Sequence, residues 1–190
     1  MSDKIFAIRF HGRGGQGAKT ASQFLAEAAL DKGKYIQAFP DYGPERTGAP
    51  MRAYVRICDQ PINIHSSVEK PDLVLVIDPT LLGMVDVTEG LAEDGMILVN
   101  SPAEPDEIKK QIGFDGKLLT VDATKIALDE LGKNIPNTTV LGALLKALPL
   151  VEVEALEEQV NKKFFKKLGE EAVKKNLRAI KRGYEEIRGL

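Results

Sequence analysis

The sequence predicts an α/β protein with a Rossmann-like, doubly wound and mostly parallel sheet. Two patterns support this fold class. Short apolar runs alternate with helix-length amphipathic segments through residues 1–150, and the run 73–77 is wholly aliphatic, which is typical of a central parallel strand buried on both faces. We therefore expect one domain, 1–190, in which residues 151–190 form a helical C-terminal extension packed on the rest.

The first half of the sheet follows from the apolar pattern in chain order. A strand is expected at 5–10, where an apolar run ends at a glycine cluster, and a helix at 18–31, where alanine, phenylalanine and leucine side chains share one face. Strands at 35–39 and 52–57 come next. After a short turn, the segment 62–65 is a candidate partner for an antiparallel hairpin.

The second half alternates in the same way. The expected strands are short apolar runs, at 73–77, 96–99 and 118–121. The expected helices are amphipathic, at 124–131 and 138–148, followed by two helices within 151–190 that break near Gly169. Asn137, directly after Pro136, is expected to cap the helix at 138–148. The lysine pairs of the C-terminal segment alternate with acidic pairs, which indicates a solvated face or a surface for a partner.

Composition excludes several classes of protein. The 26 basic and 28 acidic residues give a net charge of −2, so no nucleic-acid partner is expected. The longest aliphatic run is far shorter than the about 20 residues that span a membrane, and the N-terminus resembles no signal peptide, so we expect a cytoplasmic protein with no membrane partner. Cys58 is the only cysteine, and one thiol supplies neither an internal disulfide nor the ligands of an iron–sulfur cluster.

The strongest chemical signal is a glycine motif between the first strand and the first helix. Glycines allow close approach to the backbone and positive φ angles, and the free amides and dipole of a helix N-terminus favour an anion. Lys19, in the first helical turn, adds a cation. The predicted phosphate-binding residues are Gly12, Arg13, Gly14, Gly15, Gln16, Gly17 and Lys19. The alternative is a tight turn without a ligand.

The segment that follows the second expected strand does not match the pattern of a dinucleotide-binding site. Such a site places an acidic residue about 20 residues after the motif, at the end of the second strand. The candidate, Asp41, lies after Pro40 and is separated from that strand by it. The segment 41–50 is dense in glycine and proline, yet it contains tyrosine, glutamate and arginine. It is either a binding or docking loop or an ordinary connection.

Other reactive side chains have structural interpretations. His11 and His65 have no partners for a catalytic triad or a metal site. Asp78 and Asn100 follow two of the expected strands, where each is expected to cap the next segment rather than bind a ligand. We predict no catalytic residue and no metal ligand in this chain.

Two motifs together resemble those of the gamma subunits of 2-oxoacid:ferredoxin oxidoreductases. The resemblance extends over nearly the whole chain and includes the Asp78-Pro79 and Asn137-Thr138 steps. The two motifs are Gly12-Arg13-Gly14-Gly15-Gln16-Gly17 and Tyr42-Gly43-Pro44-Glu45-Arg46-Thr47-Gly48-Ala49-Pro50.

The second motif also distinguishes branches of this family. Members that act on 2-oxoglutarate or indolepyruvate tend to have Gly-Pro-Glu-Met-Arg-Gly-Gly in this loop. Here Arg46 and Thr47 replace the methionine and arginine, and Ala49 replaces the last glycine. The chain is therefore most similar to the branch that acts on pyruvate or branched-chain 2-oxoacids.

The resemblance implies one subunit of a larger enzyme, working with alpha, beta and delta subunits. That enzyme converts pyruvate and coenzyme A to acetyl-CoA and CO2 and reduces ferredoxin, with thiamine diphosphate and iron–sulfur clusters on the partner subunits. The gamma chain would hold no cofactor alone but would help to bind the co-substrate coenzyme A at the glycine motif. Tyr42, Glu45 and Arg46 would face the active site or the partner subunits.

Three alternatives remain at this point. The chain could be the gamma subunit of a branched-chain 2-oxoacid or indolepyruvate enzyme. It could also be a stand-alone, dinucleotide-binding oxidoreductase, with Asp41 on the ribose. The last alternative is a purely structural assembly subunit whose glycine motif binds nothing.

Overall fold

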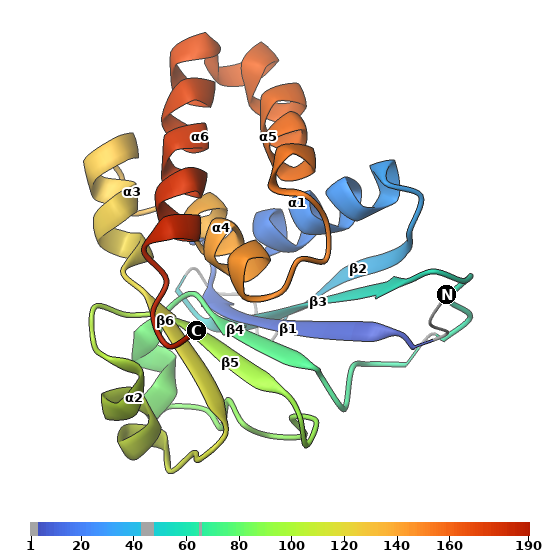
Figure 1. Cartoon of the computed structure of the whole chain (residues 1–190), viewed down its shortest axis with the longest axis vertical. Coiled ribbons are helices and arrows are strands. Elements are labelled where there is room, and N and C mark those ends of the chain that lie inside the picture. Colours follow the sequence, from blue (N-terminus) through green and yellow to red (C-terminus); the bar gives the residue numbers. More distant parts are fainter. Residues whose placement is uncertain (1–3, 43–47, 65) are drawn as a thin grey trace.

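The computed structural model describes residues 4–42, 48–64 and 66–190. In this part of the chain six strands form one sheet, in the order β2-β3-β1-β4-β5-β6 (Figure 1). The strands are β1 (Phe6–Arg13), β2 (Tyr35–Tyr42), β3 (Pro50–Cys58), β4 (Leu73–Val76), β5 (Met96–Asn100) and β6 (Lys117–Val121).

The sheet is mixed. Strands β1, β4, β5 and β6 are parallel, whereas β3 runs antiparallel to both of its neighbours, β1 and β2. The expected mostly parallel sheet with an antiparallel hairpin is therefore confirmed. The hairpin partner at 62–65 was wrong: residues 62–64 form no strand, and His65 lies outside the described residues. Both edges of β3 are already paired, so no edge remains for a returning segment.

Helices lie on both faces of the sheet, as a doubly wound fold requires. They are α1 (Ala18–Asp31), the 3-10 helix η1 (Pro79–Gly83), α2 (Pro105–Ile112), α3 (Ala123–Leu131), α4 (Asn137–Ala147), α5 (Val153–Leu168) and α6 (Glu170–Glu185). Figure 1 shows α2 on the opposite side of the sheet from α1 and α4. The helix α2 was not predicted: it is eight residues long and Ile108 is its only buried residue, although the proline at its start and Gly113 at its end are local helix signals.

Strand β4 separates two apolar cores. Leu73 and Leu75 belong to the larger core, with the side chains of α1 and α4, whereas Val74 and Val76 belong to a smaller one beneath α2. All four side chains are buried, which confirms the expected central strand.

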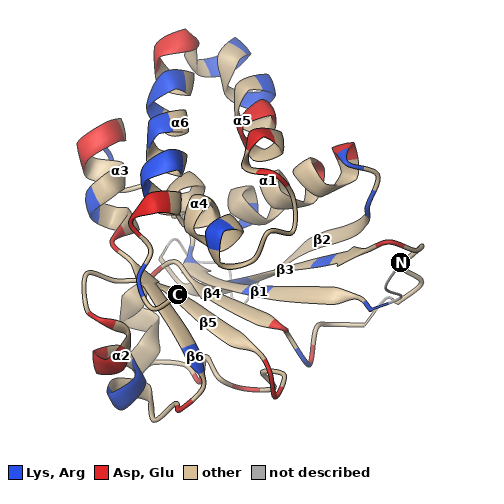
Figure 2. Cartoon of the chain, viewed as in Figure 1, with Lys and Arg blue, Asp and Glu red and all other residues tan. Residues whose placement is uncertain are grey.

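The helices α5 and α6 form a hairpin that rises from α1, α3 and α4 (Figure 1). They meet at Gly169, where the break was expected. Figure 2 shows that basic and acidic residues alternate along both helices. Several of these charges join the hairpin to the rest of the chain, as in the ion pairs Lys163–Glu27 at 2.7 Å and Arg178–Glu130 at 2.8 Å. No helix in the described ranges is both long and apolar enough to cross a bilayer.

Two glycines allow α4 and α6 to pack closely. A Cβ atom added at Gly142 would lie 2.1 Å from the carbonyl oxygen of Ile180, and one added at Gly183 would lie 2.1 Å from that of Thr139. The two helix backbones are therefore in direct contact. Because α4 also lies against α1, this contact connects the C-terminal hairpin to the first helix of the sheet.

Replacing Gly142 with alanine is expected to lower the free energy of unfolding by about 1–3 kcal/mol, the range for overpacking a core. The loss should appear although alanine is the better helix former. Denaturant titration of the full chain measures it. Gly83→Ala is the control, because a Cβ there meets nothing within 4 Å. Equal losses in the two variants would contradict the close helix contact as the cause.

Candidate functional site

The glycine motif lies at the carboxyl end of β1 and the start of α1. Gly12 and Arg13 are still part of β1, and the turn that follows is closed by a hydrogen bond from the amide of Gln16 to the carbonyl of Arg13, at 3.1 Å. Gly15 and Gly17 have φ angles of 96° and 83°, which other residues rarely adopt. The sequence therefore forms a turn that only glycine allows at these two positions.

The N-terminus of α1 has the features of an anion-binding helix end. Gly17 is its N-cap, no side chain caps the helix, and its first turn contains no acidic residue. The first amides of a helix have no partners within it, and the helix dipole makes this end positive. Lys19 is exposed in the same turn. This arrangement can bind a phosphate or a carboxylate.

Packing also restricts two glycines of the motif. A Cβ atom at Gly12 would lie 3.2 Å from the Cβ of Ala18, so β1 and α1 approach closely there. A Cβ atom at Gly17 would lie 2.6 Å from Nδ2 of Asn137, the first residue of α4. The glycine turn is thus enclosed by its own helix and by the start of α4.

Asp78 connects the glycine motif to the end of β4, the strand that lies beside β1 in the sheet. It follows β4, and its Oδ2 accepts hydrogen bonds from Nε2 of Gln16 at 2.7 Å and from Nε of Arg13 at 3.0 Å. Its Oδ1 accepts from the amide of Thr80 at 2.9 Å and from the Thr80 hydroxyl at 2.7 Å. Burial alone would raise the pKa of this carboxyl, but the hydrogen bonds from Thr80 and Gln16 and the charge of Arg13 outweigh burial, so the pKa lies below its ordinary value.

Arg13 is bound by protein groups rather than directed into solvent. Besides Asp78, its guanidinium donates to the carbonyl of Gly48 at 3.0 Å, to Oγ1 of Thr80 at 2.9 Å and to Sδ of Met84 at 3.0 Å. Gln16 is engaged in the same way, because its Oε1 accepts from the amide of Arg13 at 2.8 Å. Of the predicted binding side chains, only that of Lys19 is exposed.

The C-terminal end of the second motif contacts the first motif. The amide of Gly14 donates to the carbonyl of Ala49 at 3.3 Å, and Arg13 reaches Gly48. Tyr42 is the last residue of β2 and pairs with Met51 of β3. The side chain of Tyr42 and all of Glu45 and Arg46 lie outside what the structure describes, so their predicted role stays a prediction.

The acidic residue that a dinucleotide site needs is in the wrong place. Asp41 is on β2, and β3 separates β2 from β1. The carboxylate of Asp41 instead accepts a hydrogen bond from the Tyr54 hydroxyl at 3.4 Å. Strand order therefore removes the adjacency of β1 and β2 on which dinucleotide binding of this type depends.

The other polar residues near the strand ends have structural roles. Asn100 donates to the carbonyl of Ile77 at 2.8 Å and accepts from the amide of Thr124, in the first turn of α3, at 3.0 Å. It therefore binds the start of a later helix, and the expectation that it caps the segment directly after it was wrong. His11 is buried; burial, followed by the charges of Arg9 and Arg52, lowers its pKa to about 3, so the imidazole is neutral at pH 7.

Asn137 is the residue that sequence reasoning misplaced. It is not the N-cap of α4 but its first residue; Pro136 holds the cap position. Asn137 is 5% exposed and borders Gly17. The sequence singled out Asn137 by its position directly after a proline and by the Asn137-Thr138 step, and neither signal indicated a neighbour of the glycine turn.

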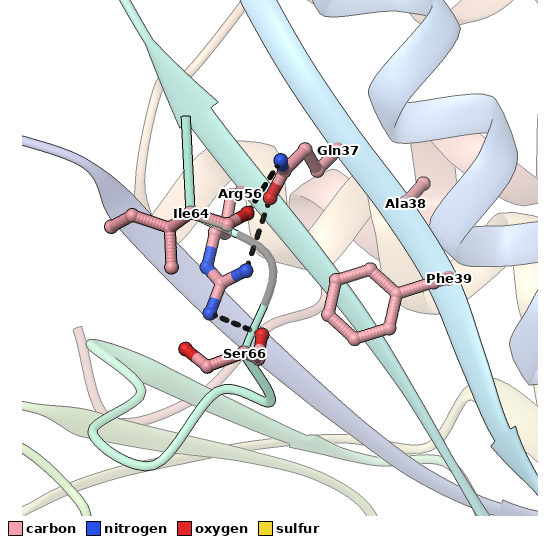
Figure 3. A pocket seen from close by; sticks show the side chains of 6 residues that line it. All are labelled: Gln37, Ala38, Phe39, Arg56, Ile64 and Ser66. Atoms are coloured by element: carbon pink, nitrogen blue, oxygen red, sulfur yellow. Dashed lines mark hydrogen bonds between the residues drawn. The ribbon is translucent and has the colours of Figure 1, made fainter. Parts of the chain in front are cut away.

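A separate hollow of about 310 Å³ lies on β2 and β3, away from the glycine motif. Figure 3 shows Arg56 at its centre, where the guanidinium donates to Oε1 of Gln37 at 3.0 Å and to the carbonyl of Ser66 at 2.9 Å. The guanidinium also lies 5.6 Å from the ring centre of Phe39. These contacts attach the segment after β3 to the sheet, and we assign the hollow a structural role.

Potential metal ligands are scattered. Among the residues that the structure describes, no three His, Cys, Asp or Glu side chains are grouped to hold a metal ion. Cys58 is buried at the end of β3. A single thiol does not match the donor set of an iron–sulfur cluster.

Comparison with known proteins identifies the family. The family model for pyruvate ferredoxin/flavodoxin oxidoreductase matches residues 7–186. The pyruvate synthase subunit PorC of Thermotoga maritima is 54% identical over 188 residues, which cover 99% of this chain and 97% of that protein. The protein named "Pyruvate/ketoisovalerate oxidoreductases common subunit gamma" in Pyrococcus furiosus is 49% identical and covers 95% of this chain and 96% of its own length.

A solved structure has the same fold. The crystal structure of the Thermotoga maritima pyruvate oxidoreductase subunit PORC matches with a TM-score of 0.87 and 52% identity, over 97% of this chain and 98% of that one. The mixed sheet and the C-terminal helices are thus shared with a relative. The chain belongs to the pyruvate ferredoxin/flavodoxin oxidoreductase family, as a gamma subunit.

Proposed function

We propose that this chain is the gamma subunit of a multi-subunit pyruvate:ferredoxin oxidoreductase and that its glycine turn binds the phosphates of coenzyme A. The complete enzyme would convert pyruvate and coenzyme A to acetyl-CoA and CO2 and pass two electrons to ferredoxin. The observation that supports the phosphate site is the uncapped N-terminus of α1, with two positive-φ glycines and the exposed Lys19. The relatives named above support the reaction.

The chemistry of this enzyme is divided among subunits. One cysteine cannot hold a cluster, so the iron–sulfur clusters belong on the partner chains, together with thiamine diphosphate. The partners would be the alpha, beta and delta subunits, and ferredoxin would bind the assembled complex. This chain would orient coenzyme A for acyl transfer, and holding a reactant in the correct geometry lowers the barrier without bond-making by the chain itself.

Arg13 has a positioning role in this proposal. We had expected it to contact a phosphate, but its guanidinium is held by Asp78, Thr80 and the carbonyl of Gly48. It therefore joins the glycine turn to the end of the second motif. The backbone amides of α1 and the ammonium of Lys19 remain as the groups that bind the anion.

A second candidate differs only in the 2-oxoacid. The Pyrococcus furiosus relative is named as a gamma subunit common to pyruvate and ketoisovalerate oxidoreductases. A shared gamma chain would leave the choice of 2-oxoacid to other subunits, so a branched-chain substrate remains a candidate. The stand-alone dinucleotide-binding enzyme has less support, because Asp41 is two strands from β1.

Purification of the chain from its natural source tests assembly. We expect it to co-elute with three further subunits and with the brown colour of iron–sulfur clusters, whereas the chain expressed alone should be colourless and should not oxidise pyruvate. Gel filtration and visible absorption measure both properties. A colourless chain that oxidises pyruvate by itself would refute the proposal.

Replacing Lys19 with glutamine tests the phosphate site. Loss of about 1 kcal/mol of charge interaction at a helix N-terminus corresponds to an about fivefold higher KM for coenzyme A in the assembled enzyme. Lys32→Gln is the matched control, because Lys32 is exposed at the opposite end of α1. If both variants changed the KM equally, a general charge effect would replace the proposed site.

Replacing Asp78 with asparagine tests the support of the glycine turn. We expect a loss of about 1–3 kcal/mol in the free energy of unfolding at pH 7, because hydrogen bonds to a charged acceptor are lost. A carboxyl with a lowered folded pKa stabilises the fold above its unfolded pKa and loses this effect as it is protonated. The difference between the two proteins should therefore shrink below about pH 4 in denaturant titrations at several pH values.

Asp86→Asn is the matched control for that experiment. Asp86 accepts from the amide of Thr88 at 2.8 Å and from its hydroxyl at 2.6 Å, as Asp78 does from Thr80, but it has no hydrogen bond from Arg13 or Gln16. The Asp78 variant should lose more stability than the Asp86 variant. Equal losses would mean that only the local turn matters.

A further inference from the structure

The two edges of the sheet are protected in different ways. In the described part of the chain the edge strands are β2 and β6. An edge strand presents amide and carbonyl groups that can pair with a strand of another molecule. Pro40 lies within β2, and proline has no amide hydrogen to offer to such a strand. Strand β6 contains no proline and only one charged residue, Lys117, so its own sequence does not prevent pairing.

The last residues of the chain cover β6 instead. After α6 ends at Glu185, the chain returns to the sheet and pairs with β6 through Arg188 (Figure 1). The amide of Thr120 donates to the carbonyl of Arg188 at 3.2 Å, and the amide of Arg188 donates to the carbonyl of Thr120 at 2.8 Å. These two bonds are those of one antiparallel pair. We call residues 187–190 the C-terminal strap.

Contacts on both sides of this pair hold the C-terminal strap against the sheet. Nη1 of Arg188 donates to the carbonyl of Pro102 at 2.6 Å, and Ile187 packs against the larger core. Gly189 has a φ angle of 85°, and a Cβ atom there would lie 2.9 Å from the carbonyl oxygen of Leu118. The C-terminal strap therefore follows β6 at a distance that a larger residue at this position would increase.

The C-terminal strap lies over the backbone groups of β6 that point away from the sheet. In a strand, the backbone groups of successive residues point to opposite sides. The carbonyl of Val121 accepts from the amide of Ser101 at 2.9 Å, directly after β5, so Val121 faces β5. Thr120 and Leu118 consequently face outward. Without the C-terminal strap, their amides and carbonyls would be open to a strand from another molecule.

We propose that the C-terminal strap masks a self-pairing surface, and that without it two copies of this chain join through antiparallel pairing of their β6 strands. Two identical strands related by a twofold axis satisfy each other's outward groups at once, with Leu118 of one copy opposite Thr120 of the other. In this register each Lys117 lies opposite Val121, so the two like charges are at opposite ends of the pair. The C-terminal strap thereby keeps a free gamma chain from pairing with itself before it meets its partner subunits.

Two substitutions at one position test the backbone pair. Arg188→Pro removes the amide hydrogen that the carbonyl of Thr120 accepts, whereas Arg188→Ala keeps this hydrogen and removes the guanidinium contacts. In the full chain expressed alone, we expect Arg188→Pro to lower the Kd of self-association about tenfold or more, the order of one or two lost hydrogen bonds, and Arg188→Ala to lower it less. Sedimentation over a range of concentrations measures the Kd. Equal self-association of the unmodified chain and the proline variant would overturn the proposal.

Deletion of residues 187–190 tests whether β6 is the surface that pairs. Amide hydrogen exchange, followed by NMR, should show fast exchange at Leu118 and Thr120 in the dilute deletion variant and slow exchange when the variant is concentrated. Amides of the central strand β4 should stay protected at both concentrations, which shows that the fold is intact. Self-association with fast exchange still present at Leu118 and Thr120 would exclude β6 as the pairing surface.

The deletion variant also separates a second copy from another subunit as the molecule that β6 would bind. We expect the variant to self-associate when it is alone. If it stayed monomeric and bound its partner subunits more tightly than the full chain does, measured by co-elution on gel filtration, β6 would be a surface for another subunit and the self-pairing proposal would fail.

Discussion

Three segments that are distant in the sequence meet at the carboxylate of Asp78. The glycine motif reaches it through Arg13 and Gln16, the 3-10 helix η1 through Thr80, and the end of the second motif through the bond from Arg13 to Gly48. A carboxylate that is 6% exposed needs several donors, and each donor here comes from a segment at the carboxyl edge of the sheet. The shape of the proposed binding edge therefore depends on one buried negative charge.

Helix α4 links this edge of the sheet to the C-terminal hairpin. At its first turn Asn137 lies against Gly17, and one turn later Gly142 lets the backbone of α6 approach. The proposed binding edge, α4 and α6 are thus in continuous contact. The hairpin of α5 and α6 covers the larger core and also lines a cavity of about 260 Å³ together with the end of α3 and the start of α4.

The proposed contribution of the chain is positioning rather than bond-making. The glycine turn offers amides and one ammonium group, His11 is neutral and buried, and the single thiol of Cys58 is buried as well. These groups can hold an anionic co-substrate, and they do not make an acid–base pair or a nucleophile. A gamma subunit of this composition fits the proposal that the redox groups reside on other chains.

The sequence by itself determined the features that depend on near neighbours: the aliphatic strand β4, the apolar face of α1, the break at Gly169 and the glycine motif between strand and helix. Only the tertiary structure decided the position of β3 between β1 and β2, the internal hydrogen bonds of Arg13 and the contact of Asn137 with Gly17. Short sequence patterns show the spacing of apolar residues and the positions where glycine allows unusual backbone angles. Strand order and long-range hydrogen bonds depend on which surfaces meet after the chain has folded, and neither leaves a signal at nearby positions.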